Sequence, residues 1–241
     1  KKLKKNVIGG YVLTCIGDNR NYSIIKTKYE NSLSDIAARK AFLDLKIKYI
    51  SYPFLKRGSD ERQYNSPGVD LKIATLMRTR PGAFKEYHTS LDNFKLVNKS
   101  GLLGGLKIAR LAIQNLLNMD FYKTKKIKKS KGINPKSIFI CEPNLGKRGL
   151  YNLLGGRFVK NSDSAFKTQS RKLLDFLQYA DGINNLKDIS EYIKLDLKKT
   201  KYIFEILKKN KLISSWFILF FTKTTFRVLW FLKKYYFIID L

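Results

Sequence analysis

The first part of the chain alternates short apolar runs with polar loops. Residues 7–16 form an apolar run rich in β-branched residues, and a Gly-Asp-Asn turn follows it. This pattern predicts a buried strand with Asp18 at its carboxyl end. Apolar runs at 47–54 and 71–77 predict two further strands, and the run at 138–140 predicts a short fourth strand.

Helical periodicity separates these runs. Ser34 followed by Asp35 is typical of a helix N-terminus, with the serine as N-cap. In 100–117 the apolar positions are spaced four, three, four and three residues apart, which predicts a helix whose apolar stripe faces the core. The stripe consists of Leu102, Leu106, Ala109, Ile113 and Leu116. Strands that alternate with helices indicate an α/β layer structure.

From residue 167 onward the pattern changes to three short amphipathic segments. They are broken at Asp181-Gly182 and near Leu197, and Leu212-Ile213 begins another apolar run. Three helices followed by a strand are typical of a winged-helix domain. Such domains bind nucleic acids or dock onto proteins, and the pattern does not distinguish these two functions.

The stretch 216–241 is rich in aromatic residues, but basic residues interrupt every apolar window within it: Lys223, Arg227, Lys233 and Lys234. A membrane span needs about 20 largely uncharged apolar residues. We therefore expect no membrane span in this tail, and membrane contact through it is the less favoured interpretation. An interfacial helix and a segment packed on the body remain as alternatives.

Composition restricts the function classes. The chain has 48 Lys and Arg against 19 Asp and Glu, a net charge of +29, yet 44% of its residues are hydrophobic, which excludes a wholly disordered chain. The lysines are scattered through nearly every segment, so the charge alone does not indicate nucleic-acid binding; only 123–136 and 194–211 are dense enough to form basic patches. The two cysteines, Cys15 and Cys141, are far apart and lack CxxC spacing, which indicates a reducing, cytoplasmic location. The chain opens on Lys1 without a leader sequence, and we expect it to be a section of a longer protein.

The one histidine of the sequence has a distinctive setting. His88 follows a predicted strand and lies between Tyr87 and Asp92. Loops at strand ends are where open α/β sheets bind ligands. A carboxylate such as Asp92 is the usual partner of the second ring nitrogen in a metal-binding histidine.

Three segments together resemble a known family: 57–70 (RGSDERQYNSPGVD), 87–92 (YHTSLD) and 142–151 (EPNLGKRGLY). They are similar to a bacterial aminopeptidase-like family related to the co-catalytic zinc exopeptidases of the leucyl aminopeptidase type, whose members often carry a C-terminal winged helix. The resemblance implies that His88 and, by its place after the first strand, Asp18 are zinc ligands. It also implies that Asp60, Glu61 and Arg62 line the substrate pocket, with Tyr87 and Asp92 in supporting positions.

The family's first zinc-binding histidine, bridging aspartate and general-base glutamate have no counterpart in this sequence. Because a zinc site takes about four ligands, we expect the chain alone to be inactive and to contain no catalytic residue. The function implied by the resemblance is that of a fragment of a zinc-dependent hydrolase acting on a peptide or amide, in a family associated with polysaccharide biosynthesis. The alternative is a non-enzymatic winged-helix module that binds protein or, less expectedly, nucleic acid through Lys198, Lys199 and Lys201. Self-association is left open.

The expected fold is α/β. It comprises part of a zinc-exopeptidase-like mixed sheet with flanking helices at 1–160, a winged-helix domain at 167–213 and an aromatic basic tail at 214–241.

Overall fold

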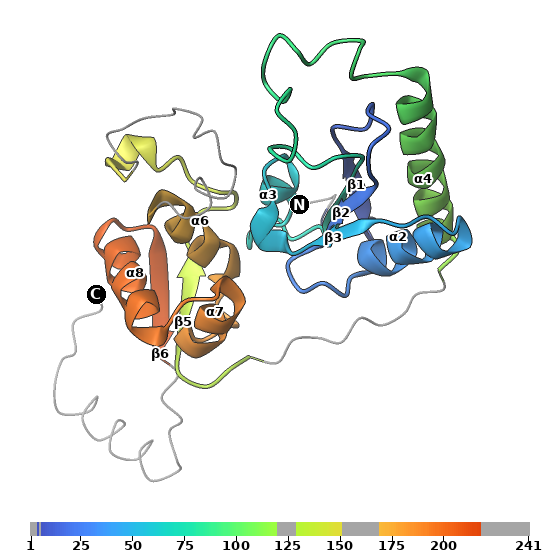
Figure 1. Ribbon diagram of the computed structural model, residues 1–241. Helices are drawn as coiled ribbons and strands as arrows, with labels where there is room; N and C mark the ends of the chain where they lie inside the picture. Colours follow the sequence, from blue (N-terminus) through green and yellow to red (C-terminus); the bar gives the residue numbers. More distant parts are fainter. Residues whose placement is uncertain (1–3, 5, 120–128, 151–168, 218–241) are drawn as a thin grey trace, which may run out of the picture.

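The computed structural model describes residues 4, 6–119, 129–150 and 169–217. It contains an α/β body and a smaller helical part (Figure 1). The predicted tail beyond 217 and the beginning of the lysine-rich stretch at 123–136 lie outside the described residues. Within those residues, no helix combines the length and apolar character needed to cross a membrane.

The strands and helices of the α/β body follow in chain order: β1 (Gly10–Leu13), β2 (Ser23–Ile25), α2 (Leu33–Asp44), β3 (Ile50–Tyr52), a 3-10 turn (Phe54–Lys56), α3 (Glu61–Tyr64), β4 (Ile73–Met77) and α4 (Lys99–Leu117). The remaining described elements are β5 (Ile133–Ser137), a second 3-10 turn (Gly146–Arg148), α6 (Gln169–Tyr179), α7 (Leu186–Ile193), α8 (Leu197–Lys209) and β6 (Ile213–Phe217).

The larger sheet has the strand order β1-β4-β2-β3 and is mixed. β1 is parallel to β4, whereas β2 is antiparallel to β4 and parallel to β3. All five residues of β4 are buried, so this strand is the centre of the body. The mixed sheet with flanking helices confirms the expected fold class; β2, only three residues long, was not predicted.

The start of α2 differs from the prediction in its capping residue. Ser32, not Ser34, is the N-cap, and it forms a capping box with Asp35. Ser34 lies inside the first turn, where its buried hydroxyl accepts a hydrogen bond from the amide of Gly10 (2.9 Å) and donates one to the carbonyl of Lys72 (2.7 Å). Ser34, which was the expected cap, therefore joins α2 to β1 and to the residue that precedes β4.

Small residues, rather than leucines, form the buried face of α4. The predicted apolar stripe is wrong for Leu102, Leu106 and Ile113, which are 45%, 60% and 44% exposed. The buried positions are Gly101, Gly105, Ile108, Ala109, Ala112 and Leu116. A Cβ atom on Gly101 would lie 1.9 Å from the carbonyl oxygen of Gly17, so the helix approaches the loop after β1 closely because it has no side chain there. The predicted leucine stripe and the buried small-residue face both repeat every three to four residues, so the periodicity alone does not show which face packs against the body.

The second part is a winged-helix domain in which α6, α7 and α8 pack against a two-stranded sheet. The predicted strand at 138–140 is wrong: the strand is β5, five residues earlier, and it pairs with β6 in an antiparallel register. β5 therefore belongs to the winged-helix domain and not to the body, which moves the division ahead of the expected boundary at 160. The apolar pattern missed this strand because it contains Asn134, Pro135 and Lys136.

The two faces of α4 predict opposite outcomes for substitution. Ala112→Leu should destabilise the fold by about 1–3 kcal/mol, because a larger side chain overpacks a fully buried position between helix and sheet. Leu106→Ala should change the free energy of unfolding by no more than about 0.5 kcal/mol. Urea unfolding followed by circular dichroism measures both, and an equal cost for the two variants would contradict the packing described here.

Candidate functional site

The carboxyl ends of β1 and β4 lie side by side at one edge of the sheet, because the two strands are parallel neighbours. Backbone hydrogen bonds join the loops that follow them. The amide of Arg78 donates to the carbonyl of Cys15 (2.9 Å), and the amide of Asn98 donates to the carbonyl of Gly17 (3.0 Å). This edge is where open α/β sheets place ligand-binding groups.

Asp18 is buried at this edge and ties the two loops together. Its Oδ1 accepts hydrogen bonds from the amide of Arg20 (2.9 Å) and the hydroxyl of Thr79 (2.7 Å). Its Oδ2 accepts one from the amide of Thr79 (2.9 Å). An ionised carboxylate offers about four acceptor positions, so one position, on Oδ2, is not used by these bonds.

A bidentate ion pair forms a second link between the loops. The Arg20 guanidinium donates to both carboxylate oxygens of Glu86, at 2.9 and 3.1 Å. These hydrogen bonds lower the pKa of Glu86 to about 2. The link joins the loop after β1 to the polypeptide two residues before His88.

His88 lies in the loop after β4, on the same side of the sheet as Asp18. Its backbone is in the left-handed region, with φ of 58°. Its exposed ring stacks on Tyr87, with centroids 3.9 Å apart and the planes inclined by 23°. Burial raises the pKa of the Tyr87 hydroxyl, and the nearby groups Cys15 and Asp92 raise it further. The Arg20–Glu86 pair and the charge interactions of Cys15 with Asp18 and Asp92 thus connect the loop after β4 with the loop that carries Asp18.

Sequence reasoning missed the part that Cys15 has in this group. The residue has a left-handed backbone, with φ of 48°, and a half-buried side chain. Burial raises the pKa of its thiol; a hydrogen bond from Thr14 opposes this rise, and the carboxylates of Asp92 and Asp18 add to it. The signal in the sequence was its place three residues before Asp18 at a strand end.

Among the residues that the structure describes, no three His, Cys, Asp or Glu side chains come together in a group that could hold a metal ion. Asp18 and His88 are therefore not members of such a group within the described part of the chain.

The segment with Asp60, Glu61 and Arg62 lies at the opposite edge of the sheet. It precedes β4, and the side-chain amide of Asn65 binds both the amide and the carbonyl of Ile73 at the amino end of that strand (3.1 and 2.7 Å). Five residues of strand separate the two edges by about 15 Å. The residues that precede β4 and those that follow it thus lie at opposite edges, and the place of Asp60, Glu61 and Arg62 in a substrate pocket stays a prediction.

The side chains of this segment make structural contacts. Glu61 is buried and accepts hydrogen bonds from the amides of Gly58 (2.7 Å) and Ser59 (3.1 Å). Arg62 pairs with Glu142 at 3.3 Å. Asp60 is exposed at the start of α3.

The lysines of the winged-helix domain lie on the solvent side of α8. Lys198 and Lys201 are exposed, whereas Thr200, Ile203 and Phe204 face inward. Lys199 forms an ion pair with Asp196 at 2.9 Å. Tyr202, 64% exposed, adds an aromatic ring to the same helix.

Glu86→Gln should weaken the link between the two loops in a pH-dependent way. A carboxyl group whose pKa is lowered on folding stabilises the folded state above its unfolded pKa of about 4.3, and this contribution is lost as the pH falls toward the folded value. The melting temperature of the variant should therefore lie below that of the parent at pH 7, and the difference should shrink as the pH falls from about 4.5 through 2. A difference that is constant across this range would contradict the ion pair.

Comparison with known proteins gives matches for both parts. Residues 1–120 match a family described as a domain of unknown function, DUF4910, and residues 134–215 match a winged helix-turn-helix family. A protein of Clostridium acetobutylicum, provisionally named as a polysaccharide biosynthesis protein with an aminopeptidase-like domain, is 34% identical over 209 residues, which cover 87% of this chain and 44% of that protein. A crystal structure from the same organism, provisionally described as a peptidase, is 28% identical with a TM-score of 0.46 and covers 89% of this chain and 43% of its own.

The chain thus spans less than half the length of these two relatives. It is similar to a protein named for an aminopeptidase-like domain, and its C-terminal part is a winged-helix domain.

Proposed function

We propose that this chain forms part of the active site of a zinc-dependent, aminopeptidase-like hydrolase that acts on a peptide or amide bond. Asp18 and His88 are the two zinc ligands that it contributes. The observation that carries the proposal is the parallel pairing of β1 with β4, because the loops that carry Asp18 and His88 both begin at the same sheet edge and are joined by the Arg20–Glu86 pair. The aminopeptidase-like domain in the name of the relative supports the same reaction class.

The chemistry of the donors is compatible with zinc but incomplete. Carboxylate oxygen and imidazole nitrogen are common zinc ligands, and zinc takes about four ligands in all. Asp18 offers one unused acceptor position on Oδ2, and His88 an exposed ring. Since no three His, Cys, Asp or Glu side chains of the described residues form a group that could hold a metal ion, the proposal concerns the protein that carries this chain and not residues 1–241 alone.

When bound, zinc lowers the pKa of a coordinated water and polarises a carbonyl group. The residues of this chain orient the donors. Three hydrogen bonds hold the Asp18 carboxylate in one position. Tyr87 supports the His88 ring by stacking, and Asp92 lies close enough to Tyr87 to raise the pKa of its hydroxyl. The general base is not among the groups proposed here.

We further propose a cytoplasmic location. Cys15 and Cys141 are both free thiols in the structure, which suits a reducing compartment.

His88→Ala tests the metal assignment in the protein that carries this chain. Loss of a direct ligand should weaken zinc binding by about 100-fold or more, at least as much as loss of the outer partners of a metal site. Zinc content after equilibration with a competing chelator, measured by mass spectrometry, checks this. The matched control is Ser90→Ala, an exposed neighbour in the same loop. Zinc retained equally by both variants would remove His88 from the site.

A specific observation also favours a second candidate function, nucleic-acid binding by the winged-helix domain. The solvent face of α8 carries Lys198, Lys201 and the exposed ring of Tyr202. In Figure 1, α8 lies on the side of its domain away from the α/β body. Lysines beside an exposed aromatic ring suit a phosphate backbone with accessible bases.

Lys198→Gln combined with Lys201→Gln should weaken binding to a short DNA duplex if α8 contacts phosphates. The plot of log affinity against log salt concentration should lose about one unit of slope for each lysine. The control replaces the same number of basic residues on α4, Lys107→Gln with Arg110→Gln. Fluorescence anisotropy at several salt concentrations measures both, and equal loss in the two double variants would indicate only nonspecific attraction to the charge of +29.

A further inference from the structure

The Arg-Gly-Ser-Asp-Glu-Arg sequence that marks the family resemblance lies away from the candidate site, and the segment around it faces the winged-helix domain instead. In Figure 1, α3 and α6 face each other across the junction of the two parts. We call residues 53–66 the junction segment. It comprises the 3-10 turn, the polar turn after it, and α3 with the two residues that follow.

An apolar side chain of the junction segment completes the core of the other domain. Phe54 is 1% exposed and belongs to the same buried cluster as Leu145, Leu173 and Phe176. Burial of a phenylalanine contributes strongly to any interface. The winged-helix core is thus shared with the body.

A buried charge lies beside this phenylalanine. Arg57 is fully buried, and its Nη1 lies 2.6 Å from Oδ1 of Asp175 on α6. Its Nη2 is 3.8 Å from Oε2 of Glu142, and its guanidinium lies 4.9 Å from the ring centroid of Phe54. Both acids come from the part of the chain after β5. A buried arginine whose acidic partners come from the opposite side of a junction imposes one relative position, because any other would leave the charge unpaired.

Side chains of α6 also bind the backbone of the junction segment. Arg171 Nη2 donates hydrogen bonds to the carbonyls of Leu55 and Arg57, both at 2.8 Å. Gln178 Nε2 donates to the carbonyl of Arg62 (2.9 Å) and to Glu142 (3.0 Å). These bonds depend on the path of the main chain, so α6 recognises the conformation of the segment as well as its side chains.

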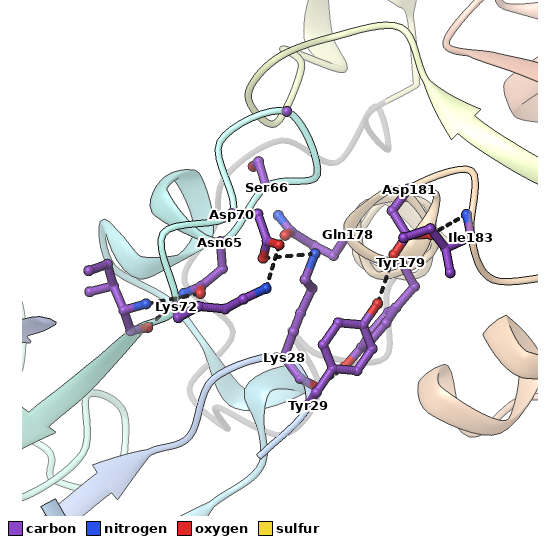
Figure 2. Close-up of polar contacts among 12 residues, drawn as sticks. Lys28, Tyr29, Asn65, Ser66, Asp70, Lys72, Gln178, Tyr179, Asp181 and Ile183 are labelled. Atoms are coloured by element: carbon purple, nitrogen blue, oxygen red, sulfur yellow. Dashed lines mark hydrogen bonds and ion pairs between the residues drawn. The ribbon is translucent and has the colours of Figure 1, made fainter. Parts of the chain in front are cut away.

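A second set of contacts extends the junction along the end of α6 (Figure 2). The hydroxyl of Tyr29 donates to Asp181 (2.8 Å), and the hydroxyl of Tyr179 donates to the carbonyl of Lys28 (3.2 Å). The Lys28 ammonium is buried 3.7 Å from Asp70, which Lys72 also contacts. Figure 2 shows these body residues converging on the end of α6.

The turn within the junction segment is held in shape by the segment itself. Glu61 accepts the amides of Gly58 and Ser59, so its buried carboxylate stabilises the turn between Arg57 and α3. Two of the three charged residues that would line a pocket by resemblance are therefore engaged elsewhere: Glu61 in local structure, and Arg62 with Glu142.

We propose that the junction segment is the docking element for the winged-helix domain, with Arg57 as its central contact and α6 as the surface that receives it. The partner of this winged-helix face is the α/β body of the same chain. The proposal does not depend on zinc binding or hydrolysis.

The test is hydrogen exchange of the intact protein, measured by mass spectrometry on peptides that cover 53–66. Asp175→Asn removes the charge that faces Arg57 and nearly preserves the side-chain shape. Exchange in the junction segment should become about tenfold faster or more, while α7 and α8 keep their protection, because a buried arginine without its ion-pair partner favours local opening.

Asp188→Asn is the matched control. Asp188 belongs to the capping box of α7, where its carboxylate accepts the amide of Asn185 (2.8 Å), within the winged-helix domain. This variant should raise exchange in α7 and leave 53–66 unchanged. If both variants speed exchange in 53–66 equally, the segment responds to general loss of stability and the docking proposal is wrong.

Gln178→Leu keeps the proposal testable if Asp175→Asn does not fold. It preserves the ion pair of Arg57 and removes the hydrogen bond to the carbonyl of Arg62. Faster exchange confined to the C-terminal half of the junction segment supports the proposal. Unchanged exchange there, with α6 still protected, overturns it.

Discussion

The parallel pairing of β1 with β4 is the constraint on which the candidate site depends. Parallel strands end at the same edge of a sheet, so the residues after each strand must meet. Asp18 stabilises the contact between the two loops, because its buried carboxylate accepts hydrogen bonds from both of them. Because of the same strand direction, the segment before β4, which contains Glu61, lies at the other edge of the sheet. One topological fact therefore puts the loop with Asp18 beside the start of the loop after β4, and puts the residues before β4 at the other edge.

The two edges of the sheet have different physical characters. The edge with His88 is exposed and held by hydrogen bonds and one surface ion pair, conditions that leave side chains accessible to a ligand. The opposite edge is buried against α6 and contains an arginine with no solvent exposure. A buried ion pair contributes little net stability because both charges lose their hydration, but it defines one arrangement of the groups around it. The junction therefore serves to orient the two parts of the chain, with Phe54 supplying apolar burial.

Several features were predictable from sequence because they depend on neighbours in the chain. The turn after residue 16 placed Asp18 at a strand end, and the break at Asp181-Gly182 separated α6 from α7. The N-cap of α2 was predicted only approximately, because Ser32 and Ser34 both lie close to Asp35. In the structure the Ser32 hydroxyl accepts a hydrogen bond from the amide of Asp35, and the Ser34 hydroxyl accepts one from the amide of Gly10.

Local sequence thus determined the winged-helix pattern, the α/β layers and the strand-end setting of Asp18 and His88, because turns, periodicity and caps act over a few residues. Tertiary structure alone decided the buried face of α4, because leucine and small-residue stripes have similar periods and only close approach to Gly17 selects the glycines. It also decided that β5 pairs with β6 and that Arg57 faces Asp175, which is 118 residues away along the chain. Such contacts depend on the partner across space, and no local pattern encodes that partner.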